Sequence, residues 1–541
     1  MQSSRNVLWI MADQLRWDYL SCYGHPHLHT PHLDRLAERG VRFDRAYIQS
    51  PFCGPSRASY YTGRYVRSHG ASWNGFPVAA GEHTIGDHLG ELGVRTALVG
   101  KTHMVPDTEG MRRLGIDPNS EIGVRVSQCG FESYVRDDGL HPYGPFDLES
   151  PYQDYLRSKG FDGPNPWEDW ANSGEDADGN PLSAWLVKYS NLEARIPNEH
   201  AETPYMTRKA MEFMEEAGDQ PWLCHLSLIK PHWPHIVSSP YHDMYGPEHI
   251  LPAIRNQEEV DNGHPIFKEY TESRICTGFS REEARQTYIP AYMGLIKQID
   301  DQMGLLFEWM DSRGLLDNTM IVFSSDHGDY LGDHWMGEKD LWHEQSIRVP
   351  LIIYDPRPEA NATRGTVSNA FVEGIDLIPT FLSYFAGKQK PHILEGRDLT
   401  PLLSQGDEVP WRDYVIAEYD YATRPARRPL GVNQEDARLI MIRNERWKYV
   451  HCEGFRPVLF DLENDPEELT DLGSHPDYSE IRATLHEAIF EWSRRHHNRT
   501  TLTAERIEFM TDVVEPPGIL IGVWDEQEFE SLFNKPFSER P

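Results

Sequence analysis

Apolar runs alternate along this chain with segments of helical pattern, and this alternation limits the possible folds more than any other feature. The first apolar run, Asn6 to Ala12, precedes a helix expected over His32 to Arg39. Thr30 and Pro31 have the positions of an N-cap and a first helical residue, and Gly40 stops the helix. The alternation continues with helical patterns at 85–92, 207–217 and 283–313 and strands at 95–100, 222–229, 320–325 and 349–354. We therefore predict an α/β fold with a large, mostly parallel sheet between helices on both faces.

Two other parts of the chain have different patterns. Between 105 and 199 the periodicity gives way to Gly, Pro, Asp, Trp and Tyr, and the aromatic residues favour a functional insertion or lid over a disordered linker. After Pro410, short strands at 439–443 and 447–451 precede a helix at 478–496. We therefore predict a large α/β domain over 1–410 and a smaller α+β subdomain over 411–541.

The last segment of the chain, from about Thr500 to Pro541, mixes apolar residues with no clear period. These residues need a surface to cover, on a neighbouring subunit or on the body of the same chain: Ile507, Phe509, Ile519, Ile521, Trp524 and Phe533.

The chain has 85 Asp and Glu residues against 52 Lys and Arg residues, a formal net charge of −33. So acidic a surface repels nucleic acid and anionic lipid, so we exclude both as partners, and an anionic substrate requires a local basic pocket. The apolar run from Val7 to Ala12 is too short for a secretory signal, and no run could span a membrane, so we expect a cytoplasmic protein. The six cysteines lie far apart without a CxxC pair, which fits neither a disulfide framework nor a zinc finger.

The most informative motif is Cys53-Gly54-Pro55-Ser56-Arg57. Because Pro55 suits the first turn of a helix, we expect Cys53 at a helix N-terminus, where backbone amides and the helix dipole stabilise an anionic nucleophile or oxyanion. Arg57, one turn later, can reach back to the same place. For the motif taken alone, the alternative is an inert buried cysteine.

Polar residues follow two of the predicted strands. Asp13 and Gln14 end the first strand, and Asp326 and His327 end a later one. Because the carboxyl ends of parallel strands meet at one edge of a sheet, these four side chains can converge on a divalent cation. The alternative for either pair alone is a strand-end polar group satisfied by loop amides. Oxygen-rich sets favour Ca²⁺, whereas a mixed set with imidazole also suits Mn²⁺, so both ions stay open.

The CxPSR string resembles the sulfatase signature, in which the cysteine is oxidised after translation to formylglycine. Other family motifs have counterparts in the same order at Val7 to Gln14, Thr30 to Gly40, Gly100 to His103, Ser325 to Gly328 and Leu459 to Leu472. The resemblance therefore covers nearly the whole chain, with 105–199 the least matched. The chain is most similar to bacterial arylsulfatases and phosphonate monoester hydrolases of the alkaline phosphatase superfamily, and then to choline sulfatases.

The resemblance implies roles for five further residues. Lys101 and His103 follow the strand at 95–100 two residues apart, so both can meet the nucleophile from one face. His232 and Lys339 match the family's leaving-group histidine and lysine. Asn74 matches an active-site asparagine of phosphonate hydrolases, and a loop amide that satisfies the backbone is an equal alternative.

The function that the resemblance implies is hydrolysis of aryl or alkyl sulfate monoesters, with slower turnover of phosphonate monoesters and phosphodiesters. It implies formylglycine at position 53 and one divalent cation bound by Asp13, Gln14, residue 53, Asp326 and His327. Most sulfatases have aspartate in place of Gln14 and many have asparagine in place of His327, which leaves the metal open. A formylglycine-generating enzyme would be the maturation partner, and the tail would form a homo-oligomer, a dimer or tetramer.

Three alternatives to this function differ in testable ways. The main activity could be that of a phosphonate monoester hydrolase or phosphodiesterase, or that of a choline-sulfatase-like enzyme. A non-catalytic binding protein would have lost the nucleophile or the metal ligands, all of which this chain retains. The chain has no GxSxG, GxxxxGK[ST] or HExxH motif, which excludes the enzymes that depend on them.

Six further histidines receive no chemical role. Four of them precede or begin the first predicted helix: His25, His27, His29 and His32. This position and the lack of a recognised ligand spacing favour a plain loop over a second metal site. His334 and His343 lie near the second metal strand in sequence, and we expect them only to line the pocket.

Overall fold

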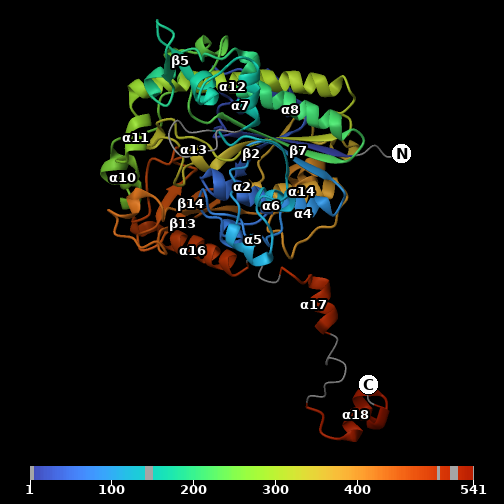
Figure 1. Ribbon diagram of the computed structural model, residues 1–541. Helices are drawn as coiled ribbons and strands as arrows, with labels where there is room; N and C mark the ends of the chain where they lie inside the picture. The colour runs from blue at the N-terminus through green and yellow to red at the C-terminus, as the bar shows by residue number, and fades with distance from the viewer. Residues whose placement is uncertain (1–4, 140–149, 496–499, 512–521, 540–541) are drawn as a thin grey trace.

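The computed structural model describes residues 5–139, 150–495, 500–511 and 522–539, and its centre is a nine-stranded sheet (Figure 1). The strand order is β10 (Thr366–Ser368), β2 (Val41–Tyr47), β9 (Arg348–Tyr354), β8 (Thr319–Ser325), β1 (Asn6–Asp13), β7 (Trp222–Pro231), β3 (Arg95–Gly100) and β4 (Glu132–Arg136), with β11 (Val372–Glu373) beside β2. Among these described strands only β9 runs antiparallel to its neighbours. The predicted α/β class with a mostly parallel sheet is confirmed.

Strand β1 explains why helices cover both faces of the sheet, because every one of its residues is buried. Leu8 and Ile10 pack with α1 (Pro31–Arg39), α8 (Glu202–Ala217) and α12 (Glu282–Asp311). Val7 and Trp9, on the opposite face, pack with α2 (Cys53–Thr62), α4 (Ile85–Gly90) and α14 (Leu377–Tyr384). Figure 1 shows α8 and α12 on one side of the sheet and α2, α4 and α14 on the other. A strand buried on both faces is expected to be a continuous apolar run.

One helix start differs from the sequence prediction, and another agrees with it. The helix expected at 207–217 begins at Glu202, because Pro204 lies in the first turn, where a missing N–H leaves no hydrogen bond unmade. Thr30 is the N-cap residue of α1 and Pro31 its first residue, as predicted, although the Thr30 side chain makes no capping hydrogen bond. Asp300 of α12 supplies that contact, accepting hydrogen bonds from the backbone N–H groups of His32 at 3.0 Å and Leu33 at 2.9 Å.

The segment 105–199 contains several short elements where the sequence indicated none. They are α5 (Thr108–Leu114), α6 (Glu121–Ser127), β4, α7 (Pro151–Ser158), β5 (Ser173–Glu175) and β6 (Pro181–Ser183). Strand β4 extends the main sheet beside β3. These elements are short and mostly half-buried or exposed, which explains their weak periodicity.

The C-terminal part contains an antiparallel sheet in the order β12 (Tyr414–Asp420), β13 (Arg438–Asn444), β14 (Trp447–Cys452) and β15 (Val458–Asp461). Helix α16 (Ser479–Arg494) packs its Leu485 and Ile489 on one face of this sheet. The other face, including Val415 and Met441, joins the core of the large sheet.

The tail contains α17 (Ala504–Thr511) and α18 (Glu526–Phe533), which lie apart from the body in Figure 1. Phe509 is 59% exposed and Trp524 is 90% exposed, so neither covers the body of its own chain. Ile519 and Ile521, which the sequence analysis grouped with them, lie outside the described residues.

The remaining helices are α3 (Val66–His69), α9 (Glu258–Asp261), α10 (Pro265–Thr271), α11 (Arg274–Phe279), α13 (Glu344–Ile347) and α15 (Thr400–Gln405). Within the described ranges, no helix is long and apolar enough to cross a membrane. All six cysteines are free.

Candidate active site

The carboxyl ends of four adjacent strands place the predicted site residues together. Asp13 ends β1, Asp326 follows β8, Lys101 follows β3 and His232 follows β7. Cys53 faces them from the first position of α2, with only 1% of its surface exposed. The parallel topology of β8, β1, β7 and β3 therefore brings residues from distant parts of the chain to one edge of the sheet.

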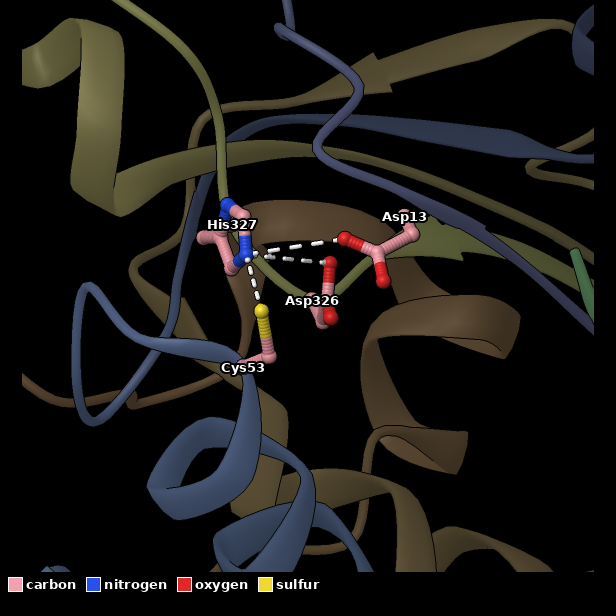
Figure 2. Close-up of side chains that lie close together, drawn as sticks. All are labelled: Asp13, Cys53, Asp326 and His327. Carbon is pink, nitrogen blue, oxygen red and sulfur yellow. Dashed lines mark hydrogen bonds and ion pairs between the residues drawn. The ribbon is translucent and has the colours of Figure 1, made fainter. Parts of the chain in front are cut away.

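Four buried side chains form a cluster suited to a cation, shown in Figure 2. Ligand atoms of Asp13, Cys53, Asp326 and His327 all lie within 4.8 Å of one another. His327 Nε2 is 3.0 Å from Cys53 Sγ, 3.6 Å from Asp13 Oδ1 and 3.8 Å from Asp326 Oδ1. His327 Nδ1 donates its hydrogen to the carbonyl oxygen of Gly328 at 2.9 Å, which turns Nε2 towards the cluster.

The donor set fits a divalent cation. Asp13 Oδ1 is buried and has no hydrogen-bond partner among the described residues, although a buried carboxylate oxygen normally has one. Two carboxylates and one imidazole match the oxygen and nitrogen ligands of Ca²⁺ or Mn²⁺. These residues are the ones that would hold the ion.

Gln14 lies beside this cluster in the left-handed backbone region, at φ 65°. Its amide Nε2 donates to Asp329 Oδ2 at 2.5 Å, and its Oε1 accepts from Lys339 Nζ at 3.1 Å. Asp329 thus fixes which way the amide of Gln14 points. Burial raises the pKa of the Asp329 carboxyl to about 6. Asp329 was not among the predicted site residues, because nothing in the sequence shows that a residue beyond the Asp326-His327 pair turns back towards Gln14.

Arg57 is fully buried and connects three of the strand ends. Its Nε donates to Asp326 Oδ2 at 2.7 Å, and its Nη2 lies 3.4 Å from Asp13 Oδ2. Its Nη1 donates to the carbonyl oxygen of Lys101 at 2.8 Å and to the hydroxyl of Ser227 at 2.7 Å. Arg57 therefore neutralises two buried carboxylates instead of reaching into the open pocket.

Buried cations surround residue 53. Lys101 Nζ donates to Asp13 Oδ2, and Lys339 Nζ lies 3.2 Å from His232 Nε2. Burial opposes ionisation of the Cys53 thiol, but the positive charges of Lys339, His327 and Lys101 outweigh it and hold its pKa well below the usual value. The position therefore stabilises an anion, as the helix N-terminus predicted.

Three predicted residues lie at the pocket wall. His103 lines the pocket, and its backbone N–H donates to Asp138 Oδ1 at 2.9 Å. Asn74 also lines the pocket, and its Oδ1 accepts from the backbone N–H of Gly54 at 2.7 Å. A Cβ at Gly54 would lie only 2.7 Å from that oxygen, so the close approach requires glycine there. Burial and the charge of Lys339 lower the pKa of His232. The Nδ1–H group of His232 donates to the carbonyl oxygen of Trp233 at 2.8 Å.

The active-site pocket has a volume of about 490 Å³ and apolar walls. Aromatic side chains that the sequence analysis did not assign to the site form much of the wall: Phe52, Trp167, Trp185 and Trp233. Arg424, from the C-terminal part of the chain, completes it. Arg424 pairs with Asp340 at 2.5 and 2.7 Å and lies 4.8 Å from the centre of the Phe52 ring, so its charge is already balanced.

The histidines set aside above lie outside this pocket. A second group of potential ligands, His32 with Asp300 and Asp301, is accounted for by protein contacts. Lys297 Nζ donates to Asp300 at 3.1 Å and to Asp301 at 2.5 Å, and Asp300 also caps α1. His334 and His343 stack on each other at 4.0 Å and are not among the lining residues, so the expectation that they line the pocket was wrong.

Comparisons with known proteins agree with this geometry. The family model described as Sulfatase matches residues 5–387, and that described as N-sulphoglucosamine sulphohydrolase, C-terminal, matches 332–495. The chain is 31% identical to the multifunctional alkaline phosphatase superfamily protein PehA of Trinickia caryophylli, over 92% of this chain and 96% of that protein. It is 29% identical to an arylsulfatase of Clostridium perfringens, over 88% and 91%. The solved phosphonate monoester hydrolase of Silicibacter pomeroyi superposes with a TM-score of 0.80 at 28% identity, over 93% and 98%.

Proposed function

Because the chain belongs to the sulfatase family of the alkaline phosphatase superfamily and is an ester hydrolase, we propose that it hydrolyses aryl or alkyl sulfate monoesters. The observation that carries this proposal is the position of Cys53, at a helix start between the buried cations Lys101 and Lys339 and beside two carboxylates. We assign catalysis to 1–410 and completion of the pocket wall to 411–541, through Arg424.

The proposal includes two groups that this chain's residues would hold. Asp13, Gln14, residue 53, Asp326 and His327 would bind one divalent cation, which supplies Lewis acidity and favours the ionised nucleophile. Formylglycine at position 53, made by a formylglycine-generating enzyme, supplies an aldehyde hydrate with two hydroxyl groups, one for attack and one for release of the product.

The protein side chains perform the remaining tasks. Lys101 and Lys339 bind the negative charge of the ester, and the helix N-terminus adds backbone N–H groups. His232 or Lys339, whose Nζ lies 3.2 Å from His232 Nε2, would assist departure of the leaving oxygen. His103, which follows β3 as Lys101 does, would accept a proton at its ring nitrogen when sulfate is released.

Phosphonate monoesters and phosphodiesters are the second candidate substrates. The close superposition on a phosphonate monoester hydrolase and the presence of Gln14 and Asn74 favour them. Lys101 and His103 favour sulfate, because this lysine and histidine match the sulfatase pair and His103 would be the base for release of the product. We therefore expect sulfate esters to have the higher kcat/KM.

The test compares kcat/KM for p-nitrophenyl sulfate and p-nitrophenyl phenylphosphonate with fully modified protein. A higher value for the phenylphosphonate would overturn the ranking. The role of His103 is tested separately with His103→Ala, in which a covalent sulfated enzyme should accumulate and be visible by intact-protein mass spectrometry. Loss of the first chemical step without an adduct would contradict that role.

A further inference from the structure

A second hollow, of about 380 Å³, lies directly beside the active-site pocket. The side chains of Trp185, Trp233, Ile275 and Glu338 line both. The rings of Trp185 and Trp233 meet edge to face, with centroids 4.8 Å apart at 63°. An aromatic pair therefore forms the boundary between the two spaces.

This aromatic pair is held in place by hydrogen bonds at its polar atoms. Trp185 Nε1 donates to Glu168 Oε2 at 2.8 Å, and Trp233 Nε1 donates to the carboxylate of Glu338. Both indoles are half-buried, so parts of their rings stay open to a ligand. Because their N–H groups are already satisfied, the open parts offer apolar contact and stacking.

The outer hollow combines apolar walls with two arginines. Val187 and Phe279 line it together with Arg274, at the start of α11, and Arg281, just before α12. Both arginines are exposed, and among the described residues neither guanidinium has an ion pair; the Arg281 side chain donates to the carbonyl oxygen of Gly278 at 3.4 Å. Two arginines without a carboxylate partner in one hollow leave positive charge available to an anionic ligand.

A buried histidine provides an independent observation at the same place. His235 lines the outer hollow and is only 2% exposed, and its Nε2 has no hydrogen-bond partner in the described part of the chain. Its ring stacks on Tyr288 with centroids 5.1 Å apart, which fixes its orientation. A buried ring nitrogen without a partner is uncommon in native proteins, and a polar group of a ligand would provide one.

We infer that the outer hollow binds the far end of the alcohol portion of the substrate, and that this portion is an extended aryl group that ends in a carboxylate or similar anion. The inference rests on the proposed function, which puts the ester at residue 53. The aromatic pair fits a flat ring, and Arg274 and Arg281 supply charge for the distal anion. A neutral saccharide fits less well, because it carries no charge to pair with Arg274 and Arg281.

The kinetic test uses two matched esters, biphenyl-4-yl sulfate and its 4′-carboxylate derivative. The wild-type enzyme should prefer the carboxylate ester by about tenfold in kcat/KM, since each charge-assisted contact is worth a factor of several. In the double variant Arg274→Gln, Arg281→Gln this ratio should fall close to one. Arg112→Gln, an exposed arginine on α5, is the matched control and should keep the wild-type ratio. Thermal melting checks that all variants are folded.

A binding measurement separates this inference from the proposed function. Calorimetry with the alcohol 4′-hydroxybiphenyl-4-carboxylate should give a Kd about tenfold lower than with 4-phenylphenol, and the double variant should lose the difference. Equal affinities, or a preference that persists in the double variant, would overturn the subsite whatever the turnover. If the alcohols bind as expected but the matured enzyme hydrolyses neither ester, the subsite stands and the proposed function fails.

Discussion

Replacing Arg57 by methionine should lower the free energy of unfolding more than replacing any exposed arginine would. The guanidinium is fully buried and lies within 3.4 Å of the carboxylates of Asp326 and Asp13. It makes three further hydrogen bonds, to Tyr61, Lys101 and Ser227. Methionine keeps most of the volume but leaves two buried carboxylates with less positive charge nearby. Breaking a buried ion pair in this way costs about 3–5 kcal/mol.

The expected loss of unfolding free energy corresponds to a shift in Tm. Unfolding 541 residues carries an entropy of about 1.1 kcal/mol/K near the transition, so Arg57→Met should lower Tm by about 3–5 °C. Arg57→Lys keeps the charge, but the lysine side chain cannot make all the contacts of the guanidinium. It should therefore lower Tm by about half as much as Arg57→Met. The control is Arg112→Met. The side chains of Arg112 and Glu109 are each 76% exposed, so their ion pair is worth under about 1 kcal/mol.

The assay is thermal unfolding followed by circular dichroism, in the presence of a chelator so that no cation compensates the two carboxylates. If Arg57→Met lowers Tm no more than Arg112→Met does, the reasoning is refuted. That result would mean that the buried carboxylates relax or become protonated without cost.

Four further results are expected. Cys53→Ala should abolish turnover while keeping the fold, and peptide mass spectrometry with aldehyde trapping should find formylglycine at position 53 in active protein; a homogeneous thiol there would contradict the proposal. Chelation should abolish activity and Asp13→Asn should lower it by orders of magnitude, because a charged ligand is lost; active enzyme without stoichiometric metal by elemental analysis would rule this out. Burial raises the pKa of Glu418 from 4.5 to about 7, so the folded protein retains a proton that the unfolded chain releases, and stability should fall as pH rises from 4.5 to 7. Glu418→Gln should remove about 3 kcal/mol of the stability change between pH 4.5 and 7 in urea unfolding, and an unchanged pH dependence would exclude Glu418 as its cause. The exposed tail predicts a homo-oligomer by light scattering, and a monomer at assay concentration would count against it.

The sequence predicted those site residues that depend on local rules. Asp13 and Asp326 could be anticipated because each follows an apolar run, and the ends of parallel strands meet. Cys53 could be anticipated because Pro55 marks a helix start. The fold class followed from the same alternation of strands and helices.

The remaining parts of the site depend on tertiary packing, which leaves no local pattern. Trp185 belongs to a segment without strong periodicity, and Arg424 lies far along the chain, so only the folded chain shows that both line the pocket. Thr30 was correctly predicted as the N-cap residue of α1, but the carboxylate that accepts from the first amides of this helix is Asp300 of another helix. The helix-start rule considers only neighbours in sequence and so does not predict that contact. Arg57 was expected to reach the nucleophile, whereas its contacts hold the carboxylates beneath it.

The burial of Cys53 would set a time limit on the modification proposed for it. In the folded chain only 1% of this residue is exposed, so an enzyme that acts on its sulfur would need access before α2 packs against the ends of β1 and β8. Folding and oxidation then compete for each newly made chain. Chains that fold first would retain the thiol permanently, so the active fraction of a preparation would record the rate of synthesis relative to the supply of the modifying enzyme. Slower expression should therefore give a higher specific activity from the same amount of folded protein.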